Sequence, residues 1–281
     1  MIGGIELGGT KCVLAVANNP LDIIEKMIVP TRDPHSTISD IKSFFSNYKI
    51  NRLGVGSFGP LVIDSASADY GLLTTDSKRG WKGTNLVKEF SGINKKIILD
   101  TDVNAAALGE YHYGSGKASE TFVYVTVGTG IGVGVLVKGE PLLGNFHLEI
   151  GHMFVPNVDG FSGICRVHGS CWEGLASGPA IQARWGIEAS ELSINHQAWK
   201  KEAQLLSFGI VNIMANHSPD KIVLGGGVMN QKHLFEMIRL NVEDIWNGHT
   251  LLGDISNLIL EPALDDNSGI VGSLSLALQL D

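Results

Sequence analysis

Residues 121–139 read TFVYVTVGTGIGVGVLVKG, in which two apolar runs flank the glycine turn Gly128–Thr129–Gly130. Residues 2–19 read IGGIELGGTKCVLAVANN and repeat that pattern around Gly8–Gly9–Thr10. Each stretch predicts a β-hairpin, because runs rich in valine and isoleucine form strands and glycine permits the tight turn. A repeat at this distance indicates a duplicated domain rather than a solenoid.

The same order of elements follows both hairpins. The first half predicts strands over 2–7, 11–18, 23–31, 52–59 and 95–100 and helices over 37–48 and 103–113, with Ser36, Thr37 or Ser39 capping the first helix. The second half predicts strands over 121–128, 130–139, 141–144, 220–227 and 257–264 and helices over 196–217, 228–246 and 267–279. The stretch INRLGVGSFGP of the first half corresponds to PDKIVLGGGVM of the second half, which strengthens the inference of a duplication.

The repeat predicts two domains that face each other across a cleft, a favoured place for ligands. We expect the first domain to comprise residues 1–115 together with a C-terminal helix at about 267–281. Residues 116–266 would form the larger second domain, and the join would fall near 114–117.

Composition excludes several classes of protein. The chain has 281 residues with a formal net charge of −8 and no basic run, so we expect no nucleic-acid partner. Neither a signal peptide nor an apolar stretch of about 20 residues is present, so we expect a cytoplasmic protein without a membrane partner. The cytosol would keep any cysteine that binds no metal as a thiol, which applies to Cys12.

The glycine turns suit phosphate groups, since their backbone N–H groups are unobstructed by a Cβ atom. Thr10 and Thr129 would add hydroxyl donors, and Lys11 would add positive charge. Each turn alone could be an ordinary hairpin turn, but matched turns in both halves favour phosphate binding. A third glycine loop, GGGVM at Gly225–Met229, would let a base or ribose approach the backbone closely. Neither the Rossmann nor the Walker pattern is present.

A metal-binding pattern follows the second hairpin. His152, Cys165, His168 and Cys171 form H-x12-C-x2-H-x2-C, and two imidazoles with two thiolates suit tetrahedral zinc. The alternatives are a surface loop with incidental thiols and a disulfide across six residues, which a reducing compartment disfavours. We expect a structural site that holds about one zinc per chain.

The stretch LDTDVNAAALGE, residues 99–110, places polar residues where a strand passes into a helix. Thr101 and Asp102 could each cap that helix, because both accept hydrogen bonds from first-turn N–H groups. A carboxylate could also accept a proton from a hydroxyl nucleophile. The two interpretations are compatible if one residue caps the helix and the other faces the cleft.

Seven motifs together resemble the repressor/open-reading-frame/kinase (ROK) family of sugar kinases, and most closely its bacterial fructokinases. They are GIELGGTK, GVGSFGP, DVNAAALGE, VTVGTGIGVG, EIGH, CRVHGSCWEGLASGPA and IVLGGGV, which occur in family order over nearly the whole chain. The resemblance implies an α/β, actin-like or ribonuclease-H-like two-domain fold. It also implies phosphorylation of a hexose with ATP and Mg²⁺, a bound Zn²⁺ and a homodimer.

The resemblance also implies roles for individual residues. Asp102 matches the catalytic base. Sugar contacts would come from Glu149, His152, Glu173, Asn104 and Gly59, although Asn104 could instead serve helix and loop geometry. Nucleotide contacts would come from Gly8, Gly9, Thr10, Lys11, Gly128, Thr129, Gly130, Gly178, Pro179, Gly225, Gly226, Gly227 and Val228. We expect His147 to serve local structure.

Two departures from the family pattern bear on specificity. Glu6 replaces the usual aspartate of the phosphate motif, where it could still organise Mg²⁺ through water. Thr101 replaces an asparagine that contacts glucose in family glucokinases, and TTDSKRGW at 74–81 is similar to the fructokinase segment. We therefore expect phosphorylation of D-fructose to fructose 6-phosphate. The alternatives are a broader hexokinase of the same family and a non-catalytic sugar sensor.

Overall fold

Two five-stranded sheets form the framework of the computed structural model, which describes residues 1–94, 96–250 and 253–279. The sheet orders are β3-β2-β1-β4-β5 and β10-β9-β6-β7-β8, the same arrangement written from opposite ends. The strands are β1 (Ile2–Leu7), β2 (Lys11–Asn19), β3 (Asp22–Pro30), β4 (Arg52–Ser57), β5 (Ile97–Thr101), β6 (Thr121–Val127), β7 (Ile131–Val137), β8 (Glu140–Pro141), β9 (Lys221–Gly225) and β10 (Ile259–Leu260). The expected duplication is confirmed.

Pairing is also the same in both sheets. β1 pairs antiparallel with β2 and parallel with β4, and β6 pairs antiparallel with β7 and parallel with β9. The last strand of each set, β5 or β10, runs parallel to its neighbour. We call the first sheet with its helices the first lobe, and the second sheet with its helices the second lobe.

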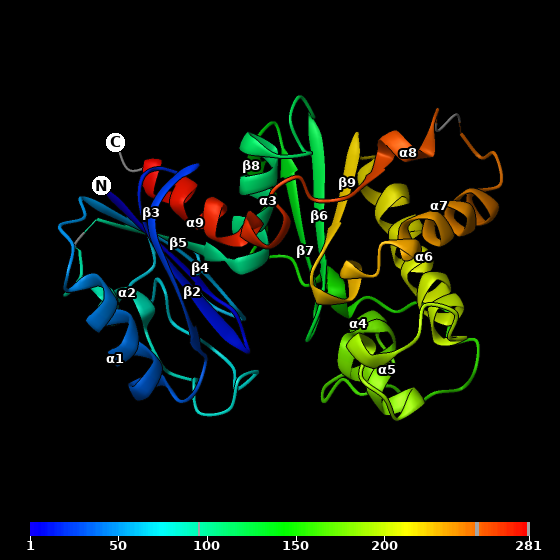
Figure 1. The fold of residues 1–281 in the computed structure, drawn as a ribbon, viewed down its shortest axis with the longest axis horizontal. Helices are drawn as coiled ribbons and strands as arrows, with labels where there is room; N and C mark the ends of the chain where they lie inside the picture. Colours follow the sequence, from blue (N-terminus) through cyan, green and yellow to red (C-terminus); the bar gives the residue numbers. More distant parts are fainter. Residues whose placement is uncertain (95, 251–252, 280–281) are drawn as a thin grey trace.

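Helices lie outside both sheets and between them (Figure 1). The α-helices are α1 (Pro34–Phe45), α2 (Leu86–Phe90), α3 (Asp102–Tyr113), α4 (Trp172–Ala176), α5 (Gly178–Trp185), α6 (Ala198–His217), α7 (His233–Trp246), α8 (Ile255–Leu258) and α9 (Ser268–Leu278), with short 3₁₀ turns at Ile150–His152, Ala189–Glu191, Gly227–Asn230 and Asp265–Asn267. Figure 1 places α3 and α9 between the sheets, α1 and α2 beside the first, and α6 and α7 beside the second. None of the helices in the described ranges is long and apolar enough to span a bilayer.

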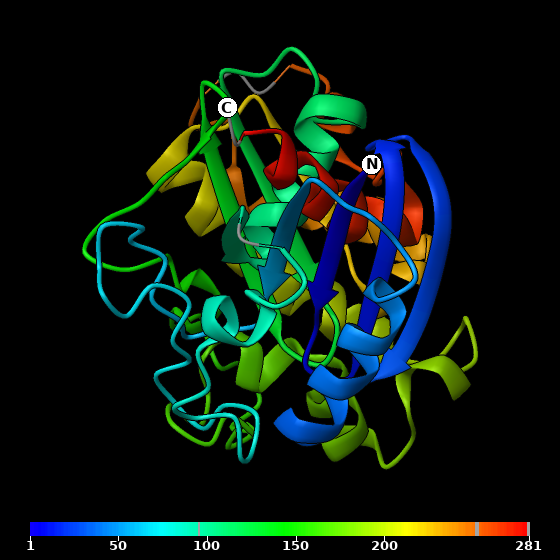
Figure 2. The same cartoon turned by 90° about the vertical axis from the view of Figure 1, so that its left-hand side faces the viewer.

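The strand β2 is buried on both faces of the first sheet, whereas the edge strand β3 is largely exposed. Leu14 packs into the core with α1, whereas Val13 and Ala15 pack against Ile270 of α9. Successive side chains of a strand point to opposite faces, so a continuous apolar run covers both. Figure 2 shows α9 behind the strands of this sheet, so the last helix of the chain returns to the first lobe.

Close contact between α3 and α9 depends on glycine. A Cβ atom on Gly109 would overlap the carbonyl of Ser268, and one on Gly272 would overlap the carbonyl of Ala105. The buried carboxylate of Glu110 also joins these helices, since it accepts from Ser268 Oγ at 2.7 Å and from the N–H of Leu264 at 3.0 Å. The first lobe therefore holds α9 at a fixed distance from α3.

Gly272→Ala should destabilise the protein by about 1–3 kcal/mol, because the added methyl group forces the two helices apart. Gly92→Ala is the matched control, since a Cβ atom there meets nothing within 4 Å. Denaturant unfolding of both variants checks this prediction. Equal stability of the two variants would show that the helix contact tolerates a wider separation.

Four sequence expectations need correction. The first helix begins at Pro34 and ends at Phe45, and Asp33 caps it by accepting from Ser36 N–H, so none of the three expected residues is the cap. Proline at the first position fits a helix start, because that N–H lacks a partner anyway. Strands predicted over 141–144 and 257–264 pair only at Glu140–Pro141 and Ile259–Leu260, and the helix predicted over 228–246 divides into a 3₁₀ turn and α7. Residue 95 of one predicted strand and residues 280–281 of the predicted C-terminal helix lie outside the described residues.

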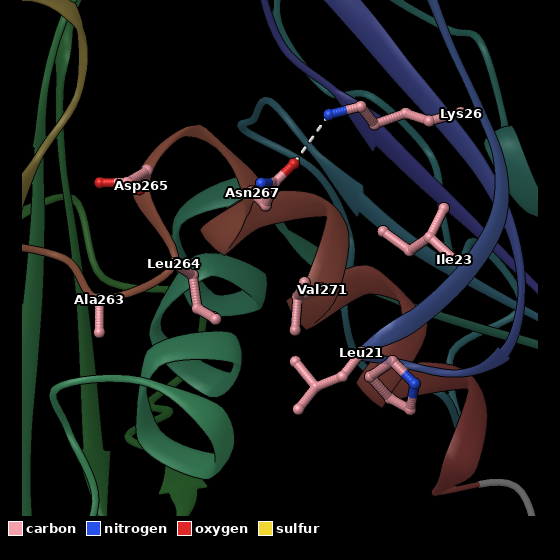
Figure 3. Close-up of a pocket in the computed structure, with 9 residues that line it drawn as sticks. Leu21, Ile23, Lys26, Ala263, Leu264, Asp265, Asn267 and Val271 are labelled. Atoms are coloured by element: carbon pink, nitrogen blue, oxygen red, sulfur yellow. Dashed lines mark hydrogen bonds between the residues drawn. The ribbon is translucent and has the colours of Figure 1, made fainter.

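A cavity of about 420 Å³ lies where the β2–β3 hairpin meets the start of α9 (Figure 3). Lys26 Nζ donates to Asn267 Oδ1 at 2.9 Å across its rim. Leu21, Ile23, Leu264 and Val271 line it. This cavity borders the chain crossing between the lobes rather than the glycine turns.

Candidate active site

The two glycine turns meet between the lobes. Thr10 Oγ1 lies 3.2 Å from Thr129 Oγ1, although the two residues belong to different sheets. The turn at Gly8 closes through its N–H to the carbonyl of Lys11, and the turn at Gly128 closes through its N–H to the carbonyl of Gly130. The matched turns therefore lie next to each other where the two lobes meet, with their threonine hydroxyls in contact.

The predicted nucleotide residues of the second lobe also lie together. Gly178 N–H donates to the carbonyl of Gly128 at 2.8 Å, and a Cβ atom on Gly128 would lie 3.8 Å from Gly227 N. Gly226 has a φ of +90°, which an L side chain rarely adopts. A cavity of about 120 Å³ opens beside this loop and is lined by Leu224, Gly225, Gly226, Met229, Asn230, Lys232, Pro262, Asp265 and Asp266. Val228 is buried.

Asp102 begins α3 without capping it. Thr101 is the cap, because its Oγ1 accepts from Asn104 N–H at 3.1 Å. The carboxylate of Asp102 accepts from the N–H of Val103 at 2.8 Å. Burial raises the pKa of Asp102 to about 6, against the lowering effect of that hydrogen bond. A carboxylate with this pKa is ionised at neutral pH and basic enough to accept a proton.

Glu6 lies near the end of β1 and pairs with Gly56 of β4, where a Cβ atom would lie 3.4 Å from Asp102 Cα. Burial, and then the charge of Asp102, raise the pKa of Glu6 to about 7, and Asp266 acts in the same direction. Glu6 Oε2 is buried with no hydrogen-bond partner among the described residues. Hard divalent cations bind such oxygen atoms, so these carboxylates fit Mg²⁺.

Asn104 is turned toward the protein interior. Its Nδ2 donates to Asp100 Oδ1 at 2.8 Å, and the residue is 6% exposed. Asp100 also accepts from the N–H of Thr101 at 2.7 Å. This pair fixes the junction of β5 and α3, which supports the geometric role that the sequence left open.

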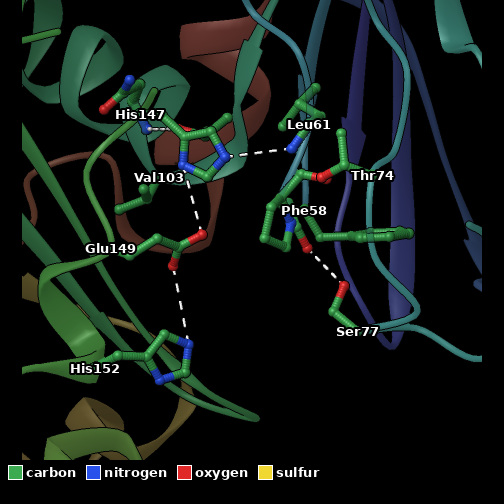
Figure 4. Close-up of polar contacts among 12 residues, drawn as sticks. Phe58, Leu61, Thr74, Ser77, Val103, His147, Glu149 and His152 are labelled. Atoms are coloured by element: carbon green, nitrogen blue, oxygen red, sulfur yellow. Dashed lines mark hydrogen bonds and ion pairs between the residues drawn. The ribbon is translucent and has the colours of Figure 1, made fainter. Parts of the chain in front are cut away.

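A chain of polar contacts through His147 and Glu149 links the two lobes (Figure 4). Leu61 N–H in the first lobe donates to His147 Nε2 at 3.2 Å, and His147 Nδ1 lies 3.6 Å from Glu149 Oε1. Glu149 Oε2 lies 3.9 Å from His152 Nε2. A Cβ atom on Gly59 would meet the His147 ring at 3.1 Å, so the loop approaches as closely as its backbone allows. The expectation of a merely local role for His147 is wrong, because its contact spans both lobes.

Glu149 is a carboxylate that other acids influence. Burial, and next the charges of Glu173 and Asp102, raise the pKa of Glu149 to about 7. The charge of Asp102 therefore raises the pKa of both Glu6 and Glu149.

The four predicted metal ligands form a cluster. One ligand atom from each of His152, Cys165, His168 and Cys171 lies within 4.8 Å of all the others. Cys165 Sγ is 3.8 Å from His152 Nδ1 and from His168 Nδ1, and Cys171 Sγ is 3.5 Å from His152 Nδ1. Tetrahedral zinc with bonds of about 2.3 Å to sulfur and about 2.0 Å to nitrogen needs S···N separations of about 3.5 Å. The donor set and its spacing fit Zn²⁺.

The cysteine loop also positions acidic side chains. Glu173 lies in the first turn of α4, two residues after Cys171, and its Oε2 accepts from Ile131 N–H at 3.1 Å, beside the second glycine turn. A ligand histidine commonly donates its second ring N–H to a carboxylate, and Glu149 stands at that place beside His152. The metal cluster therefore supports both predicted sugar-binding glutamates.

Residues 2–280 match the sequence profile of the ROK family. This chain belongs to the ROK family. It is 42% identical over 286 residues to a putative fructokinase of Bacillus subtilis, covering 99% of this chain and 96% of that protein. It is 37% identical over 290 residues to a fructokinase of Zymomonas mobilis, covering 98% of this chain and 96% of that protein. The resemblance expected from the motifs is confirmed.

Solved ROK structures share the fold. A glucokinase from Streptomyces griseus in complex with glucose and AMPPNP superposes with a TM-score of 0.81 at 21% identity, covering 99% of both chains. A hexokinase from Thermus thermophilus gives a TM-score of 0.79 at 22% identity, covering 99% of this chain and 98% of that one. The expected actin-like, two-domain ROK fold is confirmed.

Proposed function

We propose that this ROK protein transfers the terminal phosphoryl group of ATP to D-fructose and forms fructose 6-phosphate. The observation that carries the proposal is Asp102, whose pKa is raised to about 6 and whose charge raises the pKa of both Glu6 and Glu149, as suits a base between a phosphate side and a sugar side. Relatives 35–42% identical over nearly the whole chain are named fructokinases, one of them a putative one.

The transfer follows from these positions. The sugar hydroxyl attacks the terminal phosphorus, its proton passes to the Asp102 carboxylate, and the bond to the bridging oxygen of ADP breaks. The N–H groups of the turns at Gly8 and Gly128, with the hydroxyls of Thr10 and Thr129, hold the phosphate oxygens as negative charge shifts among them. Glu6 would hold Mg²⁺, which supplies charge neutralisation when bound.

Fructose would bind on the other side of Asp102. Glu149 and Glu173 would accept hydrogen bonds from its hydroxyl groups, and the loop at Gly59 would approach it through backbone alone. We place His152, the zinc-ligand candidate, behind Glu149 rather than against the sugar. Thr101 is occupied as the cap of α3, so it offers no side-chain contact comparable to the glucose-binding asparagine.

A panel of hexoses in a coupled ADP-release assay tests the proposal. We expect fructose to give the highest kcat/KM, with glucose and mannose at least tenfold lower. A flat profile across hexoses would support the broader hexokinase instead. Sugar binding without ADP formation from any hexose would support a sensor and contradict the proposal.

We expect kcat/KM for fructose to fall at least tenfold for each pH unit below about 6, because protonated Asp102 accepts no proton and Glu149, with a pKa of about 7, is by then protonated as well. The pKa of Asp102 is raised but remains below 7, so the ionised form prevails at neutral pH and is lost only as the pH falls. Rates from pH 5 to 8, with saturating ATP and Mg²⁺, check this. A rate unchanged down to pH 5 would exclude Asp102 as the group that titrates.

The domain boundaries and the assembly state belong to the same proposal. We place the hinge at residues 114–117 and near residue 267, so that 1–115 with α9 moves against 116–266. The buried carboxylate of Glu110 accepts hydrogen bonds from Ser115 N–H and from Ser268 Oγ. These hydrogen bonds would hold together the two places where the chain passes between the domains. We also propose a homodimer, which the molar mass of the purified protein in solution tests.

A further inference from the structure

One segment of the first lobe, residues 74–81, touches both parts of the proposed site. Its first residue, Thr74, contacts the loop at Gly59 and Pro60, which we call the sugar loop. The N–H and Oγ1 of Thr74 donate to the Pro60 carbonyl at 3.0 and 3.1 Å. Ser77 Oγ donates to the carbonyl of Gly59 at 2.6 Å, and Figure 4 shows Thr74 and Ser77 beside that loop. Trp81 anchors the end of the segment, because its buried indole donates to the carbonyl of Arg32 at 2.8 Å.

Lys78 extends from this segment to the first glycine turn. Its Nζ donates to the carbonyl of Gly9 at 2.7 Å, and its side chain is partly buried. The next residue, Thr10, carries the hydroxyl that lies 3.2 Å from Thr129 of the second turn. Ser77 and Lys78 are adjacent, yet one contacts the sugar loop and the other contacts the phosphate turn. The segment therefore joins the sugar loop to the first phosphate turn and places an ammonium group at that turn.

We propose that Lys78 binds the phosphoryl group while it moves from ATP to the sugar. This inference rests on the proposed function and names a further residue of that site. A lysine ammonium has three donors, so one can remain on Gly9 while the others bind phosphate oxygens. The oxygen–phosphorus bond to the sugar forms, the bond to ADP breaks, the sugar proton passes to Asp102, and Lys78 keeps its protons. A fixed positive donor stabilises the negative charge carried by the oxygens in transfer.

Kinetics test the assignment first. In Lys78→Met, which keeps the stem and removes the charge, we expect kcat to fall about 100-fold or more, as for loss of one charge-stabilising donor. The KM for fructose should stay within threefold of wild type. Arg79→Met is the matched control, an exposed neighbouring cation outside the site, and should stay within twofold of wild type in both parameters. A kcat within threefold of wild type in Lys78→Met would overturn the proposal.

Ligand-binding measurements then distinguish phosphoryl binding by Lys78 from a purely structural role in which Lys78 only holds the segment in place. Titration calorimetry of Lys78→Met should show affinity for fructose 6-phosphate and for AMPPNP at least tenfold weaker, with affinity for fructose and ADP within threefold of wild type. If Lys78 had only a structural role, Lys78→Met would instead weaken fructose binding, because the segment supports Gly59 and Pro60. Equal losses for fructose and fructose 6-phosphate would overturn the proposal.

Different results would contradict the proposed function and the role of Lys78. A wild-type protein inactive on every hexose contradicts the proposed function, and the AMPPNP–ADP comparison still decides whether Lys78 holds the terminal phosphate. An active wild type with an equally active Lys78→Met variant contradicts only the role of Lys78.

Discussion

We expect Asp102→Asn to lower kcat for fructose by about a thousandfold, because the asparagine amide accepts no proton from the sugar hydroxyl. The side chains have nearly the same size, and Asn Oδ1 can still accept from the N–H of Val103. The KM values for fructose and ATP should therefore stay close to wild type. Initial rates at saturating ATP and Mg²⁺ measure the loss directly.

Asp100→Asn is the matched control. Asp100 lies two residues away, and burial raises its pKa to about 6 as well. Its Oδ1 accepts from Asn104 and Thr101, contacts that an asparagine retains. We expect this variant to keep kcat within a few-fold of wild type. If both variants lost activity equally, the effect would come from the β5–α3 junction and not from Asp102 as a base.

Cys171→Ser should remove the metal and weaken fructose binding. Purified wild-type protein should carry about one zinc per chain, and the variant should carry almost none, because three ligands remain and a hydroxyl is a poor substitute for a thiolate. Losing support for Glu149 and Glu173 should lower kcat/KM for fructose about 10–100-fold, the range seen when groups that orient a metal site are altered. Metal analysis and kinetics on the same sample measure both effects.

Cys12→Ala provides the control for this experiment. Cys12 is a buried thiol of β2, among the residues of the first-lobe core, and it does not belong to the ligand cluster. We expect this variant to retain zinc and the fructose KM. Undamaged wild-type protein without zinc would refute the ligand set, and full fructose affinity in zinc-free Cys171→Ser would separate the metal from the sugar site.

Sequence patterns predicted the framework well because they report local physics. The hairpins around Gly8 and Gly128 follow from apolar runs interrupted by glycine, and their repetition implied the second sheet. The metal ligands were also predictable, since three of them lie within seven residues and a zinc site needs fixed spacing. The seven motifs predicted membership of the ROK family, and the match to the family profile and the whole-chain relatives confirm it.

The remaining features depend on contacts that no local pattern encodes. Asp33 was overlooked as a cap because several better-placed serines and threonines follow it, and only Pro34 signals the earlier start. The contact of His147 with Leu61 and that of Lys78 with Gly9 join residues 86 and 69 positions apart. The fructokinase-like segment TTDSKRGW was the available signal for Lys78, but it predicted specificity rather than contact with the phosphate turn.

A crystal structure with fructose and AMPPNP bound together tests the central claim most directly. The account predicts the fructose 6-hydroxyl within about 3.2 Å of an Asp102 carboxylate oxygen, and in line with the terminal phosphorus held between the turns at Thr10 and Thr129. A bound fructose that directs another hydroxyl at the phosphorus, or that leaves Asp102 beyond hydrogen-bond reach of the 6-hydroxyl, would contradict it.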